Sequence, residues 1–376
     1  MTPGTNKKIR VLVVDDSSFM RKVLENIFNS DPQLQVVGHA KDGNEAVALA
    51  ESLKPDVITM DLNMPHVDGL QATEQIMSRN PRPIVVVSSE SKEGAASTLR
   101  ALELGAIEFV LKPSGGIDLD MNSVKEDLLR KVKIAAKVRA VRNAARLAPA
   151  VKHVPSSGGN SAESADRLAR AHAVNTSDQR LPVVVIAAST GGPATVMRLA
   201  PGFTRDFPAA IILVQHMPSN FTSQYATQLA EFTGIRVKEA EPNEALQPGT
   251  LYICPGGRHL RITPAGRIQL DSGGRINGYL PCMDVTMESA AAYAGAMSIA
   301  VVLTGMGNDS ARGVHAIKAA GGLVLVQNEA TCVIFGMPAE AIKTGAVDQI
   351  LPIDEIYAAI EKRVIGLTRP APVGVR

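Results

Sequence analysis

VVVIAASTGGP, residues 183–193, joins a run of large aliphatic side chains to a serine and a pair of glycines. An uninterrupted apolar run predicts a strand covered on both faces, as in a parallel sheet. The glycines let backbone N–H groups approach a ligand, and Pro193 suits the first turn of a helix. The stretch therefore predicts a strand, a turn and a helix. Ser189 at the turn could bind a phosphate or attack a carbonyl.

Apolar runs alternate with amphipathic segments along most of the chain, which predicts an α/β fold with parallel sheets. The runs are IRVLVV, DVITM, PIVVVS and EFVL in the first half, and VVVIAA, AAIILVQ, SIAVVLT and GLVLVQ in the second. TLYICP, residues 250–255, and LRITPAGRIQL, residues 260–270, predict a small antiparallel insertion. We expect two doubly wound domains, since 376 residues exceed what one core usually serves.

A break separates the two halves. A helical pattern over about 123–147 is apolar on one side and rich in Lys and Arg on the other, which is typical of a solvated face. Few large aliphatic residues and no aromatic residue follow before the next strand, which predicts a flexible linker with a short helical turn near 166–172. We expect a first domain over 8–125, a helical extension and linker over 126–180, and a second domain over 181–368.

The overall composition favours no charged partner. With 39 Lys and Arg against 37 Asp and Glu, nothing in the balance demands a nucleic acid or an anionic membrane. The N-terminus has no apolar signal core, and no apolar stretch is long enough to span a bilayer. Three scattered cysteines form no CxxC pair. These features predict a cytoplasmic protein with reduced thiols, without direct membrane insertion and without a nucleic-acid partner.

Carboxylates follow two strands of the first half. Asp15 and Asp16 end one apolar run and Asp61 ends another, so all three are expected at the carboxyl edge of a parallel sheet. Three carboxylates together would repel one another without a cation, and Mg²⁺ takes such hard oxygen ligands. Ser88 and Lys112 end the next two strands and would add a hydroxyl and an ammonium to the same edge.

A serine nucleophile in the second half needs a base and a group that orients that base. His216 directly follows a strand, as Ser189 does, whereas His315 lies inside a helical pattern and His259 in a glycine-rich loop that could line a pocket. Asp309 lies just past another strand, where it could also cap the following helix. Ser, His and Asp at three strand ends favour a catalytic triad.

Two familiar readings of the glycine-rich turn do not fit. An α/β-hydrolase elbow needs GxSxG, but residue 187 is Ala and the order is Ser, His, Asp. Neither a Walker loop nor a dinucleotide-binding loop matches the turn. The alternative function is a catalytically idle binding module or a DNA-binding output, although no clear basic recognition helix is present.

The first half resembles the response-regulator receiver domain, on the combination VVDDS, MDLNMP, VVSS and LKP. The resemblance implies a flavodoxin-like fold in which Asp61 accepts the phosphoryl group and binds Mg²⁺ together with Asp15 and Asp16. It also implies that Ser88 is the switch hydroxyl and that Lys112 pairs with the phosphoryl oxygens.

The second half, behind that receiver, resembles the chemotaxis protein-glutamate methylesterases of the CheB family. IAASTGGP, QHMPSNF, CPGGRH, LTGMGND and QNEATCVIFGMP carry the likeness in that order. It implies a Rossmann-like esterase domain with Ser189, His216 and Asp309 as the triad. It also implies hydrolysis of glutamate γ-methyl esters on chemoreceptor cytoplasmic helices, deamidation of receptor glutamines, and a chemotaxis histidine kinase as phosphodonor. No cofactor is implied for the hydrolysis itself.

The developing oxyanion would meet backbone N–H groups at the start of the helix after the turn, around Thr190, Gly191 and Gly192. The resemblance adds Met306 as a neighbour of that site. A switch-like half tethered to an enzyme-like half predicts that the unphosphorylated receiver obstructs Ser189 and that phosphorylation relieves the obstruction.

Several positions depart from the usual family pattern. Ala187 stands where Gly is common, Gly257 where Asp often precedes the Arg-His pair, and Ser310 where Gly usually follows the Asp. NGYLPCMD, residues 277–284, replaces a more basic stretch ending in PSVD. The three triad positions keep their residue types.

Overall fold

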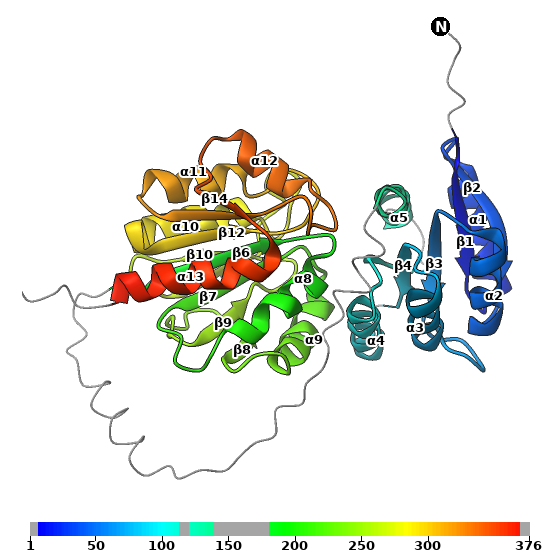
Figure 1. Cartoon of the computed structure of the whole chain (residues 1–376), viewed down its shortest axis with the longest axis horizontal. Coiled ribbons are helices and arrows are strands. Elements are labelled where there is room, and N and C mark those ends of the chain that lie inside the picture. Colours follow the sequence, from blue (N-terminus) through cyan, green and yellow to red (C-terminus); the bar gives the residue numbers. More distant parts are fainter. Residues whose placement is uncertain (1–6, 90, 113–119, 139–179, 369–376) are drawn as a thin grey trace, which may run out of the picture.

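The computed structural model describes residues 7–89, 91–112, 120–138 and 180–368, which form two α/β units (Figure 1). The predicted linker falls almost wholly outside the described residues. The helical turn expected near 166–172 falls outside them as well.

The first unit is a five-stranded parallel sheet with the order β2-β1-β3-β4-β5. This is the flavodoxin-like order, and its direction reverses between β1 and β3, where ligands of such sheets bind. Its elements are β1 (Ile9–Val14), α1 (Ser18–Asn29), β2 (Leu34–Ala40), α2 (Gly43–Leu53), β3 (Val57–Asp61), α3 (Gly69–Arg79), β4 (Ile84–Ser88), α4 (Lys92–Glu103), β5 (Glu108–Leu111) and α5 (Asp120–Ala135).

The second unit is a seven-stranded parallel sheet with the order β14-β13-β12-β6-β7-β9-β8. Its elements are β6 (Val183–Ala188), α8 (Gly192–Leu199), η1 (Ala200–Gly202), β7 (Ala210–Gln215), α9 (Ser219–Ala230), β8 (Arg236–Glu239), β9 (Thr250–Ile253), β10 (His259–Ile262), β11 (Ile268–Asp271), α10 (Met283–Ala294), η2 (Gly295–Met297), β12 (Ser298–Val302), α11 (Ala311–Ala319), β13 (Leu323–Gln327), α12 (Met337–Lys343), β14 (Gln349–Leu351) and α13 (Ile353–Thr368). The sheet order reverses at β6 and β12, so their carboxyl ends mark a second binding position.

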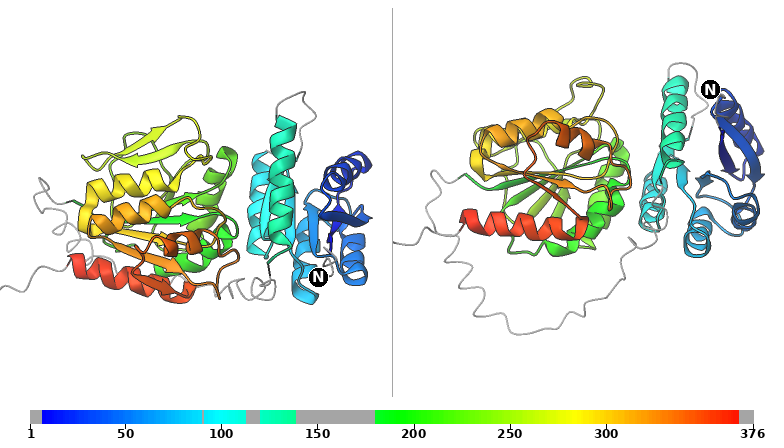
Figure 2. Two further views of the ribbon diagram at one scale, coloured as in Figure 1. Left: turned by 90° about the horizontal axis from the view of Figure 1, so that it is seen from above. Right: turned by 45° about the horizontal axis from the view of Figure 1, so that its top comes forward.

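The central strand β6 explains why this sheet is covered on both faces. Val184, Ile186 and Ala188 pack into one buried cluster, and the alternate residues Val183 and Val185 pack into another. Side chains alternate across a strand, so a run that is apolar throughout feeds two cores. Figure 2 shows helices on both faces, with α8, α9 and α13 on one and α10, α11 and α12 on the other. The prediction of doubly wound domains is confirmed.

The predicted antiparallel insertion is wrong in one part. Residues 250–253 form β9, which pairs in parallel with β7 and β8 inside the main sheet. All four side chains of β9 are buried, as expected for a strand covered on both faces. Only β10 and β11 form the small antiparallel sheet.

The predicted helix over about 123–147 begins earlier in the structure, and residues 139–147 of that prediction lie outside the described residues. It begins at Asp120 and ends at Ala135, after which Lys137 donates its backbone N–H to Ile134 and closes a turn. Leu128 and Val132 are fully buried in the core of the first unit. Helix α5 therefore crosses the predicted boundary at residue 125 without a break, and the three domain ranges stay a prediction.

The two units contact each other through the α4, β5 and α5 face of the first (Figure 2). Helix α4 packs against α8 and α9 of the second unit. Phe109 of β5 stacks on Phe221 of α9, with ring centroids 4.5 Å apart. This contact places the first unit beside the turn that follows β6.

Candidate functional site

The structure brings Ser189, His216 and Asp309 together at the carboxyl edge of the second sheet. His216 Nδ1 lies 3.2 Å from Ser189 Oγ, and His216 Nε2 lies 2.8 Å from Asp309 Oδ2. A carboxylate only accepts, so Nε2 carries the proton and Nδ1 presents its lone pair to the serine hydroxyl. This is the hydrogen-bond chain that serine activation requires.

The backbone around Ser189 is fixed by its neighbours. Its N–H donates to the Thr304 carbonyl, and its own carbonyl accepts from Gln215 Nε2 and from the Gly192 N–H. Gly191 adopts φ +74°, and a Cβ there would lie 2.5 Å from the Val333 side chain. Glycine is therefore required at the turn, which sets the direction in which the serine side chain projects.

Asp309 precedes α11 in the chain, but its carboxylate packs against the N-terminus of α10. Its carboxylate accepts from the backbone N–H groups of Met283 and Asp284 and from the Cys282 thiol, in addition to His216. Burial works against its charge, but the hydrogen bonds from His216 and the helix end hold the pKa of Asp309 below its usual value. Asp309 is therefore an anion at neutral pH.

Cys282 is a hydrogen-bond donor in this arrangement. Burial and the neighbouring Asp309 raise the pKa of the Cys282 thiol to about 12, so the group stays protonated and its S–H can donate. All three cysteines are buried and unpaired.

The alternative role of Asp309 as a cap of the following helix does not fit the geometry. Ser310 is the N-cap residue of α11, and the hydrogen bonds of Asp309 go to the start of α10 instead. Asp284 in α10 makes the reverse connection, accepting from the backbone N–H groups of Ser310 and Gly313. Asp309 thus accepts N–H groups from α10, and Asp284 of α10 accepts N–H groups from the segment after Asp309. These two sets of hydrogen bonds hold the loop that carries Asp309 against the helix that stabilises its charge.

Ser310 is strained, and we expect the Ser310→Gly variant to be more stable. The residue adopts φ +106°, and its buried hydroxyl has no hydrogen-bond partner. Removing both penalties outweighs the added freedom of glycine in the unfolded chain, for a net gain of about 1 kcal/mol. Thermal unfolding should show the second unit melting roughly 2–4 °C higher. Ser310→Ala removes only the hydroxyl and should recover part of the gain, whereas an unchanged or lower melting temperature for Ser310→Gly would contradict the strain argument.

The remaining histidine candidates lie elsewhere. His259 is fully buried, and its Nδ1 accepts from the Cys282 N–H while Nε2 donates to the Gly274 carbonyl. Both ring nitrogens are thus occupied by the backbone of one loop. His315 is exposed on α11. The geometry leaves His216 as the histidine in contact with Ser189.

The predicted oxyanion donors differ in availability. The Gly192 N–H is already bonded to the Ser189 carbonyl at 2.7 Å, so it is not free to bind an oxyanion. Within the described part of the chain, the N–H groups of Thr190 and Gly191 donate no backbone hydrogen bond. Met306 lies on the β12–α11 loop directly after Gly305. A Cβ added at Gly305 would come within 2.8 Å of Ser189 Cβ. The structure thus places Gly305 of that loop against Ser189, and the role of Met306 as a neighbour of the site stays a prediction.

The first unit has its own cluster at the β1/β3 switch point. Ligand oxygens of Asp15, Asp16 and Asp61 lie within 4.8 Å of one another. Lys112 Nζ lies 3.0 Å from Asp15 and 2.9 Å from Asp61. Burial raises the pKa of Asp61, although the Lys112 ammonium opposes this shift. Burial alone would lower the pKa of Lys112, but its pairing with Asp61 raises it. One ammonium does not balance three carboxylates, so a hard divalent cation fits this donor set.

The hydroxyl of Ser88 makes its hydrogen bonds away from Asp61 in this structure. Its hydroxyl accepts from Thr98 Oγ1 at 2.6 Å and lies 3.2 Å from the carbonyl of Gly94. Sequence position alone placed Ser88 at the correct sheet edge, but the side chain is directed to the first turns of α4. The structure therefore leaves its switch role a prediction.

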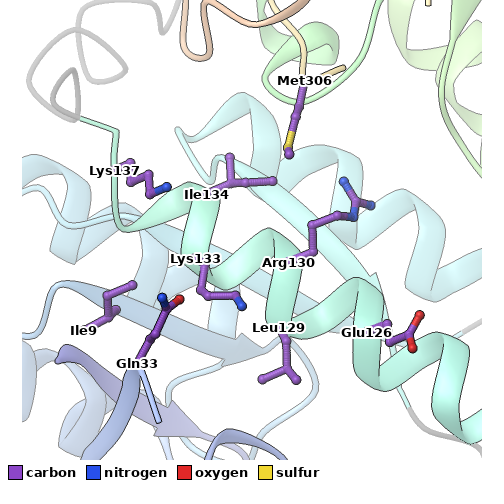
Figure 3. A pocket seen from close by; sticks show the side chains of 9 residues that line it. All are labelled: Ile9, Gln33, Glu126, Leu129, Arg130, Lys133, Ile134, Lys137 and Met306. Atoms are coloured by element: carbon purple, nitrogen blue, oxygen red, sulfur yellow. The ribbon is translucent and has the colours of Figure 1, made fainter. Parts of the chain in front are cut away.

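The first unit also contacts the turn that follows Ser189. Thr190 Oγ1 donates to Glu108 Oε2 at 2.8 Å, and Thr190 is buried. Met306 projects across to α5 over Ile134 and Arg130 at the edge of a cavity of about 400 Å³ (Figure 3). Arg130 and Lys133 in this cavity already pair with Asp127 and Asp31, so the cavity has little unbalanced positive charge.

Sequence reasoning missed several residues around the triad. Gln215 and Thr304 fix the Ser189 backbone, and Tyr279 stacks on His216 with ring centroids 5.0 Å apart. An Asn-Gly pair directly before Tyr279 is a strong signal for a tight hairpin turn, but it does not reveal what the next residue touches.

Comparison with known families assigns each half of the chain to a family model. Residues 184–360 match the CheB methylesterase family, and residues 11–121 match the response regulator receiver domain. A protein-glutamate methylesterase/protein-glutamine glutaminase of Pyrococcus horikoshii is 42% identical over 366 residues, covering 96% of this chain and 95% of the relative. The chain belongs to the CheB methylesterase family. It is a CheB-type methylesterase/glutaminase with an N-terminal receiver domain, and the alternative of an idle binding or DNA-binding output is not favoured.

One further full-length relative and two solved single-domain structures are also similar to this chain. The protein-glutamate methylesterase/protein-glutamine glutaminase of Symbiobacterium thermophilum is 41% identical, with 97% of this chain and 99% of the relative covered. The crystal structure of the Thermotoga maritima CheB methylesterase catalytic domain is 38% identical, with a TM-score of 0.47, and covers 50% of this chain and 99% of that one. The Thermotoga maritima CheB response regulator domain is 52% identical, with a TM-score of 0.33, and covers 35% and 98%.

Among the helices that the structure describes, none is both long enough and apolar enough to cross a membrane.

Proposed function

We propose that Ser189, His216 and Asp309 hydrolyse glutamate γ-methyl esters on the cytoplasmic helices of chemoreceptors and release methanol in the cytoplasm. The observation that carries the proposal is the hydrogen-bond chain from Ser189 Oγ through both nitrogens of His216 to Asp309. The names of the full-length relatives supply the substrate class and add deamidation of glutamine side chains.

The chemistry follows from the protonation states. His216 Nδ1 takes the Ser189 proton as Oγ attacks the ester carbonyl, and it then gives this proton to the departing methanol. Water repeats the cycle on the acyl-enzyme. Asp309 keeps the proton on Nε2 and stabilises the imidazolium, while the N–H groups of Thr190 and Gly191 bind the oxyanion at the start of α8. A glutamine substrate would follow the same route with ammonia as the leaving group.

The receiver cluster would be phosphorylated on Asp61 by a chemotaxis histidine kinase. Asp15, Asp16 and Asp61 would hold Mg²⁺, which screens the charge of the incoming phosphoryl group. Lys112 is already within 3.0 Å of two of these carboxylates and would pair with the phosphoryl oxygens.

Phosphorylation should require both Asp61 and the cation. Incubation with a small-molecule phosphodonor and Mg²⁺ is expected to add one phosphoryl group to the wild type and none to Asp61→Asn, because the amide is a poor nucleophile. Intact-mass spectrometry checks the addition, and omission of Mg²⁺ should abolish it. Retention of the label in Asp61→Asn would show that another residue is the acceptor.

We further propose that the unphosphorylated receiver obstructs the esterase site. Support comes from two contacts that hold the receiver beside Ser189. Glu108 accepts a hydrogen bond from Thr190, in the turn after Ser189, and Phe109 stacks on Phe221 of α9. A substrate helix approaching Ser189 would meet β5 and α5 there. Charge added at Asp61 near the same sheet can bias such a docked interface.

Removal of the receiver should therefore raise basal activity. A chain that begins near Leu181 retains the complete seven-stranded sheet, and we expect it to release methanol faster than unphosphorylated full-length protein. Initial rates on the same methylated receptor, with and without phosphodonor, provide the measurement. A folded truncated chain that is no faster would contradict obstruction and indicate that the receiver assists catalysis, without affecting the esterase assignment.

A further inference from the structure

Tyr279 covers the face of the His216 imidazole. The two rings are nearly parallel, with an interplanar angle of 11° and centroids 5.0 Å apart. The tyrosine hydroxyl lies 3.3 Å from Asn308 Oδ1 and accepts from the Asn308 N–H at 3.4 Å. Since Asn308 directly precedes Asp309, one side chain connects the proposed base with the loop that carries its carboxylate partner.

The loop that presents Tyr279 is held in place by the rest of the domain. Asn277 and Gly278 have φ of +52° and +86°, and Ile276 and Tyr279 exchange both backbone hydrogen bonds across them. This is a two-residue hairpin turn with positive φ at both central positions. It gives residue 279 a defined direction.

One buried histidine secures both ends of this loop. His259 Nε2 donates to the Gly274 carbonyl before the hairpin, and its Nδ1 accepts from the Cys282 N–H after it. The Cys282 side chain in turn donates to Asp309. The stacking partner of His216 is thus attached to the same network that fixes Asp309.

We propose that Tyr279 is a positioning residue of the esterase, whose aromatic ring holds the His216 imidazole in plane between Ser189 and Asp309 and stabilises its protonated form. This inference rests on the proposed role of His216 as the base. On the side that Tyr279 covers, the imidazole can tilt out of the line of its two hydrogen bonds only by moving against the tyrosine ring. When the imidazole becomes a cation during acylation, the negative face of the aromatic ring attracts it.

The expected effect falls mainly on the chemical step. Stacked cations gain about 0.5–2 kcal/mol, which corresponds to a roughly 2- to 30-fold change in rate. The imidazolium forms only as the reaction proceeds, so loss of the ring should lower kcat with little change in KM. The tyrosine hydroxyl should matter less, because its two contacts with Asn308 are long.

Two variants separate the aromatic face from simple bulk. Tyr279→Leu keeps an apolar side chain without a π system, and Tyr279→Phe keeps the ring without the hydroxyl. In the full-length phosphorylated protein we expect kcat for methanol release to fall roughly 2- to 30-fold in Tyr279→Leu and to stay closer to the wild-type value in Tyr279→Phe than in Tyr279→Leu. Thermal unfolding verifies that both variants are folded.

The pH–rate profile gives a second readout that a merely structural role would not move. Among the described residues, Asp309 hydrogen-bonds to the His216 ring and Tyr279 stacks on it, and Asp309 is shared with the Cys282 thiol. Only residue 279 changes, so loss of cation stabilisation should extend activity of Tyr279→Leu to lower pH relative to Tyr279→Phe.

The inference fails if Tyr279→Leu retains wild-type kcat and pH profile, or if Tyr279→Phe is as impaired as Tyr279→Leu. His216→Ala in the same assay distinguishes this failure from failure of the proposed function. Methanol release at wild-type rate by His216→Ala would remove the base assignment itself, and the inference with it. An inactive His216→Ala beside an unaffected Tyr279→Leu would overturn the role of Tyr279 alone.

Discussion

Ser189→Ala should lose methanol release from methylated receptor by a factor on the order of 10⁶ in kcat while it remains folded. The methyl side chain cannot form the acyl-enzyme, and only binding and the oxyanion donors at Thr190 and Gly191 remain to assist water. Alanine creates no clash in this half-buried position, so thermal unfolding should match the wild type. Methanol quantified from saturating, methyl-labelled receptor checks the loss.

His216→Ala and the double variant test whether the residues act as one unit. Each should lose about as much activity as Ser189→Ala, and the double variant should be no worse, because nucleophile and base contribute to one step. Ser223→Ala, at an exposed serine of α9, is the matched control and should retain full activity. Methanol release at wild-type rate by folded Ser189→Ala would exclude this serine as the nucleophile.

Asp309→Asn is expected to reduce kcat by up to about 10⁴-fold, less than loss of the nucleophile. The carboxylate now accepts the Nε2 proton and leaves Nδ1 free to act as the base. An amide NH₂ facing His216 would donate to Nε2, which shifts the ring proton to Nδ1, where it points at Ser189 Oγ. The imidazole in that tautomer cannot take the serine proton.

Asp284→Asn provides a matched control for Asp309→Asn. Asp284 is also buried and also accepts two backbone N–H groups, but they belong to Ser310 and Gly313. Its replacement should lower stability while changing kcat far less. Equal losses of kcat in the two folded variants would show that Asp309 acts through the loop structure and not through the imidazole.

The sequence predicted the centre of each sheet better than its edges. Strands such as β6 and β7 are buried on both faces, so their apolar runs are unmistakable. The strands β2, β8 and β14 were not identified, because partly exposed edge strands mix polar and apolar residues. Strand β9 was identified as a strand but assigned to the wrong sheet, since a short apolar run does not reveal its pairing partner.

The proximity of Ser189, His216 and Asp309 could be predicted because each residue follows a strand of one parallel sheet or lies in the loop after it. Chain connectivity then brings Ser189, His216 and Asp309 to one edge. What the sequence could not give were contacts between loops that are far apart along the chain. Three such contacts depend on tertiary packing. The Cys282 thiol donates to Asp309, the Tyr279 ring stacks on His216, and Asp284 of α10 accepts the backbone N–H of Ser310 at the start of α11.

The covalent intermediate on Ser189 provides the most direct measurement of the central claim. Phosphorylated full-length protein is mixed with methylated receptor and quenched in acid on the millisecond scale, and methanol release and peptide masses are followed together. We predict a receptor-derived acyl adduct on the peptide that contains Ser189, formed with the first methanol and absent from Ser189→Ala. Methanol release with the adduct on another residue, or undiminished release from Ser189→Ala, would contradict the account.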